Sequence, residues 1–216
     1  MVVMNQVFAE MQRAYINVFR WMYPSKNSTG FTERNLSVNF AEAYKKVHPD
    51  SHAWYEFQFG EKNNLHYDAV IVNPADKEIL LVESKRIKAK GKIEEIHNDI
   101  LRIQGAKDLY AGEFKDRIRE FQTYQIVGVI LADVWTEGNM KSRVRDSFAQ
   151  KTFVEDHFPE LGFMLDGLQY DIRSFDGQLT DNWMTGEFAE KLPFLERNYY
   201  LLSLIWNVTS ASARQI

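Results

Sequence analysis

The chain has 216 residues, of which 45% are hydrophobic, so it can bury one sizeable core and is short for two. We therefore expect a single domain over residues 1–216. Cysteine is absent, which excludes disulfides and thiolate zinc sites and favours a reducing, cytoplasmic location. A net charge of -4 argues against a surface that is basic overall, so any contact with nucleic acid must be local.

Two helices are predicted at the start of the chain. Apolar residues at helical spacing predict the first over 4–23, and Pro24 ends it. Thr32 stands where an N-cap is expected for the second helix, over 33–48, which Pro49 stops.

Three strands are predicted next. Residues 54–59 alternate in the manner of a strand, and 65–72 and 78–87 are strand-like apolar runs. The last two runs are separated by 73–76, a turn sequence with proline at its second position. They therefore predict an antiparallel hairpin.

A helix and a buried strand follow the hairpin. The helix begins after Gly91 and ends near Tyr110, and the strand over 126–134 is apolar enough for burial on both faces. Helix, three strands, helix, strand is an α/β order.

The last third is predicted to extend this core. We expect a basic helix over 140–150, a strand pair over 163–175 and a buried final helix over 199–208. That last apolar stretch is too short to span a membrane.

Three charged residues in apolar strands carry the predicted chemistry. Asp68 interrupts one strand of the hairpin, and Glu83 and Lys85 end the other on one face. If the hairpin closes around 74–77, Asp68 lies directly opposite Glu83, whereas a tighter closure makes them diagonal. Carboxylates at this range repel unless a cation lies between them, and Mg²⁺ prefers such oxygen ligands. Lys85 can then stabilise charge on a phosphate or orient the attacking water.

The Glu-x-Lys triplet alone is weak evidence, because roughly one copy is expected in a chain of this size. A second copy, Glu113 to Lys115, lies in a polar stretch without an apolar strand or a partner aspartate, and we discount it. The alternative for the first copy is a surface salt bridge between Lys85 and Asp68 or Glu83 on an edge strand.

In context, the pattern resembles the PD-(D/E)xK, restriction-endonuclease-like nucleases over about 31–134. The resemblance implies an α/β fold whose central mixed sheet is flanked by helices. We expect the helix over 4–23 and an additional C-terminal α+β extension over 139–210 to pack on this core. The resemblance also implies a Mg²⁺ or Mn²⁺ site formed by Asp68, Glu83 and the carbonyl of Ser84.

A fourth acid is common in this family on the helix before the sheet. The segment from Thr32 to Leu36 resembles the Glu-Arg start of that helix in archaeal Holliday-junction resolvases, which implies Glu33 as a catalytic residue. Glu56 is the competing candidate, and an acid that merely favours a helix N-terminus is the alternative for Glu33. The Gln-x-x-x-Tyr motif of the exonuclease branch is missing, since Asp108 follows Gln104 at the tyrosine position.

The predicted function is metal-dependent hydrolysis of phosphodiester bonds in nucleic acid, with DNA as the favoured partner and no membrane partner. Contacts to phosphates are expected from the basic run Arg86, Lys88, Lys90 and Lys92, although such a run is usually a solvated face. Formation of a homodimer is left open. The alternative function is a module on the same fold that binds nucleic acid or protein without cutting.

Overall fold

The computed structural model describes residues 2–21, 33–59, 65–87, 91–109, 111–135, 170–174 and 199–208. Its helices are α1 (Val2–Trp21), α2 (Glu33–Val47), α3 (Gly91–Leu109) and α4 (Ala111–Arg117), with a 3₁₀ turn η1 (Phe121–Thr123). Its strands are β1 (His52–Phe59), β2 (Leu65–Asn73), β3 (Glu78–Ile87), β4 (Gln125–Trp135), β5 (Tyr170–Ser174) and β6 (Tyr199–Asn207).

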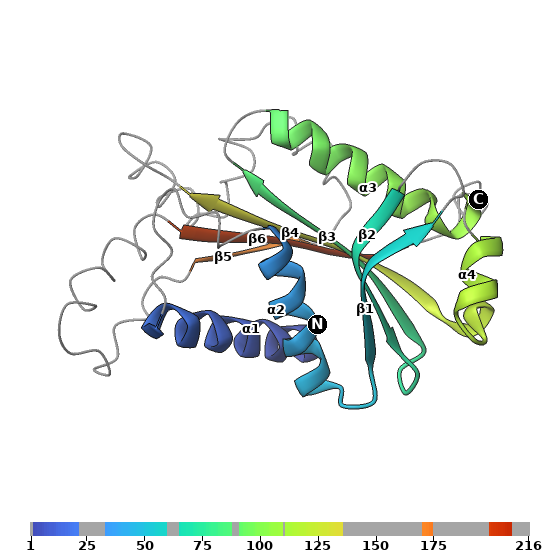
Figure 1. Cartoon of the computed structure of the whole chain (residues 1–216), viewed down its shortest axis with the longest axis horizontal. Helices are drawn as coiled ribbons and strands as arrows, with labels where there is room; N and C mark the ends of the chain where they lie inside the picture. The colour runs from blue at the N-terminus through green and yellow to red at the C-terminus, as the bar shows by residue number, and fades with distance from the viewer. Residues whose placement is uncertain are drawn as a thin grey trace.

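These elements form three layers (Figure 1). The middle layer is a six-stranded sheet in the order β1-β2-β3-β4-β6-β5. One apolar cluster joins α1 and α2 to one face, and a second joins α3 and α4 to the other. Strands β3 and β4 are parallel and every other neighbouring pair is antiparallel, so the sheet is mixed. The predicted α/β class is confirmed.

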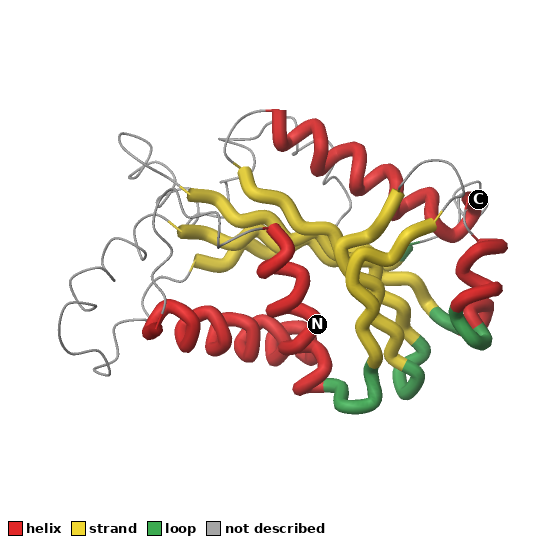
Figure 2. The backbone as a smooth tube through the Cα atoms, viewed as in Figure 1, coloured by secondary structure: helices red, strands yellow, loops and turns green. Residues whose placement is uncertain are grey.

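The first half of the chain forms the elements that its pattern predicts (Figure 2). The β2–β3 hairpin begins at the pair Asn73↔Glu78, which is the closure around 74–77 that sets Asp68 opposite Glu83. A parallel partner for β3 requires a crossover, and α3 and α4 supply it before β4. The short helix α4 was not predicted; Phe114 buries it against the sheet.

The predicted final helix over 199–208 is wrong. These residues form β6, which inserts between β4 and β5, pairs with both and directs Trp206 to the α3 side of the sheet. A short apolar run has no period that separates a buried strand from a buried helix. Its aromatic and β-branched residues favour the strand.

The remaining C-terminal predictions are only partly covered. Within the range predicted as a strand pair, β5 is a strand, and its partner is β6. The rest of that range and the predicted helix over 140–150 lie outside the described residues. Among the described helices, none is both long and apolar enough to span a bilayer.

Strands β1 and β2 change the direction of their side chains at one level of the sheet. Tyr55 packs with the α2-side cluster and Phe57 belongs to the α3-side cluster, although residues two apart normally share a face. Between them Glu56 has a φ of 51°, a left-handed conformation that is costly for a residue with a side chain. The same reversal separates Tyr67 from Ala69, so both strands bend together (Figure 1).

Gly128 on β4 offers a test of this packing. A Cβ atom there would overlap the ring of Trp206 and lie 2.8 Å from Ile103 Cγ2 of α3. We expect Gly128→Ala to lower the free energy of unfolding by about 1–3 kcal/mol through overpacking. Urea denaturation measures the change.

Gly112 is the matched control, because a Cβ on this α4 residue would have no atom within 4 Å. Gly112→Ala should be neutral or stabilising by up to about 1 kcal/mol, since alanine favours a helix. Equal effects of the two substitutions would contradict the close contact at Gly128.

Candidate functional site

Asp68 lies where β2 separates from β3. The ladder between the two strands ends at the pair Ala69↔Val82, and Asp68 and Glu83 are the next residues. Strand β3 remains paired with β4 as far as Ile87. Among the described strands, none pairs from Ser84 onward with the edge of β3 that faced β2.

Two carboxylates bind the backbone of this edge. Asp68 Oδ2 accepts the N–H of Ser84 at 2.7 Å, and Glu33 Oε1 accepts the N–H of Arg86 at 2.9 Å. The two N–H groups are two residues apart and point to one side of β3, roughly 7 Å apart along the strand. Two of the predicted site residues, from α2 and β2, thus meet at one edge.

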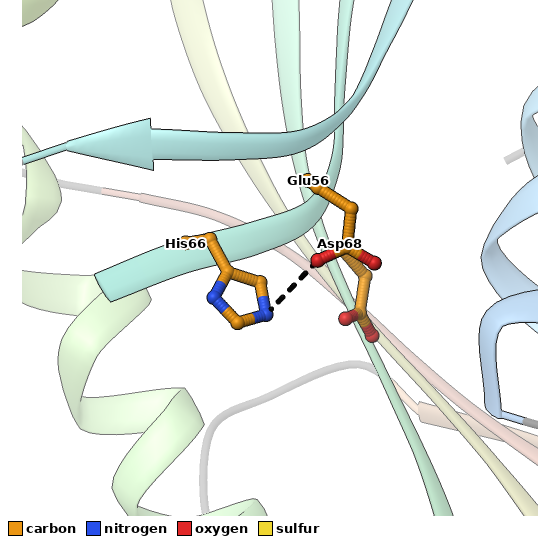
Figure 3. Close-up of side chains that lie close together, drawn as sticks. All are labelled: Glu56, His66 and Asp68. Carbon is orange, nitrogen blue, oxygen red and sulfur yellow. Dashed lines mark ion pairs between the residues drawn. The ribbon is translucent and has the colours of Figure 1, made fainter. Parts of the chain in front are cut away.

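Glu56 and His66 join Asp68 on the β1–β2 side (Figure 3). His66 Nε2 lies 3.2 Å from Glu56 Oε2, and one ligand atom from each of the three residues lies within 4.8 Å of the other two. Arg34 donates to the other oxygen of Glu56, at 2.7 Å. This acidic and histidine cluster offers carboxylate and imidazole donors that could hold a metal ion.

Glu83 is the most buried acid of the site, with 2% of its surface exposed. Burial raises the pKa of its carboxyl, and the charge of Asp68 raises it further, whereas Arg102 of α3 lowers it. Arg102 Nη2 donates to Glu83 Oε1. Burial also raises the pKa of Asp68, opposed by the Ser84 N–H and by Lys85.

Lys85 pairs with Asp99 of α3 at 2.9 Å. Burial lowers the pKa of Lys85, but the carboxylate of Asp99, together with the charges of Glu83 and Asp68, raises the pKa overall. The alternative of a salt bridge between Lys85 and Asp68 or Glu83 on an edge strand is wrong, because the partner comes from α3 and β3 lies inside the sheet.

Sequence reasoning missed three residues of this site: His66, Asp99 and Arg102. The helical stripe of Ile96 and Ile100 places Asp99 beside the face that meets the sheet, and Arg102 follows it at i+3, the spacing of an ion pair. A buried charge in an apolar stripe was the available signal. His66 carried the signal of lying two residues before Asp68 on a strand.

The other predicted residues lie at the margin of the site or outside the described residues. Lys88 and Lys90 are outside the described residues, and Lys92 lies in α3 with an undescribed side chain. Arg86 follows the site on β3 with a half-buried side chain. The discounted copy, Glu113 to Lys115, lies in the helix α4 and not in a strand.

The hydrogen bond of Asp68 makes its two simplest variants differ. Asp68→Asn keeps an oxygen for the Ser84 N–H and removes repulsion with Glu83 and Glu56, so the metal-free protein should be at least as stable as wild type. Asp68→Ala leaves that N–H without its acceptor and should cost about 1–3 kcal/mol. Thermal and urea unfolding in a chelator measure both, and Asp116→Ala on exposed α4 is the control. A loss in Asp68→Asn as large as in Asp68→Ala would contradict this account of the carboxylate.

Comparison with known proteins adds no relative. No family model matches the sequence, and no curated protein or solved structure matches the chain. The resemblance to PD-(D/E)xK nucleases therefore depends on the motif residues, and the chemistry of the site depends on the geometry described above.

Proposed function

We propose that this protein is a metal-dependent nuclease of the PD-(D/E)xK type that hydrolyses phosphodiester bonds, with DNA as the favoured substrate. One observation carries the proposal: Asp68 and Glu83 are adjacent at the opening of the sheet, and Lys85 follows Glu83 on the same face of β3. Two carboxylates and an ammonium are the groups that a Mg²⁺-dependent phosphodiesterase requires.

The donor groups fit a divalent cation. An extended residue directs its N–H and its carbonyl to the same edge, so Ser84, whose N–H meets Asp68, presents its carbonyl there too. Ligands about 2.1 Å from a metal lie roughly 3 to 4.2 Å from one another. The 3.2 Å between Glu56 Oε2 and His66 Nε2 agrees with that range, and a ligand atom of Asp68 lies within 4.8 Å of the other two residues. Asp68 belongs to both groups and would be the shared ligand.

The chain's own groups divide the remaining work. The bound cation would neutralise phosphate charge and lower the pKa of an attacking water. Lys85, held by Asp99, supplies an ammonium beside Glu83 to stabilise charge that develops on the phosphate. Glu33 fixes the start of α2 against the edge of β3 through the Arg86 N–H, beside the hydrogen bond of Asp68 with the Ser84 N–H.

The proposal extends to the fold, whose central β1–β4 sheet with α2 on one face and α3 on the other agrees with a restriction-endonuclease-like core. The runner-up function is a non-catalytic binding module on the same core. It is less economical, because it assigns no role to an ammonium beside a buried carboxylate. Burial of charge costs stability that a binding surface does not require.

Cleavage of DNA is the direct test. With Mg²⁺ or Mn²⁺, purified protein should cut at least one of a panel of linear, nicked, branched and single-stranded DNA molecules, whereas Ca²⁺ should support binding without cutting. Lys85→Ala should lower the cleavage rate by at least about a hundredfold and spare metal binding. Asp68→Ala and Glu83→Ala should lose both.

Lys115→Ala is the matched control, because this exposed lysine ends the discounted Glu-x-Lys copy on α4. It should cut like wild type after identical purification. If Lys85→Ala also cuts like wild type, the activity comes from a contaminant and the binding module becomes the better account.

The imidazole of His66 should decide between metals. Nitrogen ligands suit Mn²⁺ better than Mg²⁺, which prefers oxygen. We expect His66→Ala to weaken Mn²⁺ binding by about tenfold or more and Mg²⁺ binding much less. Titration calorimetry without DNA measures both affinities.

His52→Ala is the control, since His52 lies at the other end of β1 and is exposed. It should leave both affinities unchanged. Equal Mn²⁺ affinity in wild type and His66→Ala would remove His66 from the ligand set without affecting the assignment of Asp68 and Glu83.

A further inference from the structure

Helix α3 brings two charged side chains to the buried end of β3. Asp99, 7% exposed, and Arg102 lie one turn apart on this helix and face the strand. Arg102 Nη2 donates to Glu83 Oε1 and, at 2.8 Å, to Asp99 Oδ1. One guanidinium nitrogen therefore joins the buried carboxylate of the sheet to the buried carboxylate of the helix.

The contact with Glu83 is in the position that the proposed function gives to a metal. A buried carboxylate without a cation costs several kcal/mol, and Arg102 is the cation in contact with Glu83. A divalent ion ligated by Glu83 would bring two further positive charges to the same carboxylate. Two cations on one carboxylate repel, so Arg102 and the ion compete for it.

Arg102 can leave Glu83 without losing all its partners. Its pair with Asp99 remains, and its guanidinium carbon lies 5.3 Å from the centre of the Tyr67 ring. Its Nε is buried and has no hydrogen-bond partner within the described part of the chain, so the present position does not satisfy the guanidinium fully. Arg102 therefore keeps an acidic partner when it gives up Glu83.

Asp99 pairs with Lys85 as well as with Arg102. Lys85 Nζ lies 2.9 Å from Asp99 Oδ2, the oxygen that Arg102 does not use. One carboxylate thus anchors the lysine through one oxygen and the arginine through the other. Lys85 stays in place when Arg102 moves.

We propose that Arg102 is a positioning residue that occupies the cation position beside Glu83 in the metal-free protein, yields it to a divalent ion, and remains anchored on Asp99 together with Lys85. This inference rests on the proposed function, because it requires Glu83 to be a metal ligand. In this proposal, α3 controls the binding of the metal ion, in addition to the motif residues on β2 and β3 that would ligate it.

The test compares two variants, Arg102→Gln and Asp99→Asn. If Arg102 had only a structural role, both would change Mg²⁺ affinity in the same direction. Mg²⁺ affinity is measured by titration calorimetry without nucleic acid, and melting temperature with chelator and with saturating Mg²⁺. Arg102→Gln removes the competitor and should bind Mg²⁺ at least about fivefold tighter. Asp99→Asn leaves Arg102 with Glu83 as its acidic partner among the described residues and should bind Mg²⁺ more weakly by a similar factor.

Both variants should melt lower than wild type in chelator, and saturating Mg²⁺ should restore Arg102→Gln more than Asp99→Asn. Arg13→Gln, which removes another i,i+3 ion pair on α1, is the control and should change no affinity. If Arg102→Gln does not fold, the Nε–H resonance of Arg102 in the wild type should shift when Mg²⁺ saturates the site.

Two results would overturn the inference in distinguishable ways. Wild type that binds Mg²⁺ while Arg102→Gln binds it equally or more weakly, or an Arg102 resonance that Mg²⁺ does not move, would make Arg102 a permanent structural partner of Glu83. Wild type that binds no divalent ion would also make the ion pair permanent and would in addition remove the proposed function.

Discussion

The separation of β2 from β3 at Asp68 is the constraint on which the rest of the site depends. A strand that loses its neighbour exposes N–H groups that must find acceptors. Here the acceptors of the Ser84 and Arg86 N–H groups are carboxylates from β2 and α2. The separation of the strands therefore places two acidic side chains side by side. Glu56 on β1, whose backbone is left-handed, adds a third carboxylate next to Asp68.

Charges gathered in this way require compensation, and α3 provides it. Glu83 and Lys85 point to the α3 side of the sheet. There Glu83 pairs with Arg102, and Lys85 pairs with Asp99. The pairs are mutually dependent because Arg102 and Asp99 also bind each other. The helix therefore acts as a charged counterpart to β3 at the site, while its isoleucines pack on the apolar part of the same sheet face.

The packed sheet explains why these charges can be held in place. Glu83 and Lys85 extend from a strand that is buried on both faces and paired in parallel with β4. Gly128 of β4 leaves room for the ring of Trp206 on the neighbouring strand β6 and for Ile103 of α3, so α3 packs closely on this face of the sheet. Rigid packing of this kind limits how far the side chains can relax and so maintains groups that repel one another.

Local pattern was sufficient for the helices and strands as far as β4, except α4, and for a hairpin that brings Asp68 and Glu83 together. The structure decided which of the two possible hairpin registers forms. Turn chemistry and alternation are properties of adjacent residues, so they can be recognised in the sequence. The strand identity of β6, the bends at Glu56 and Asp68, and the partners His66, Asp99 and Arg102 were decided by tertiary structure. Each depends on which segments meet across the sheet, and an apolar run or a lone charge carries no record of its distant partner until the chain has packed.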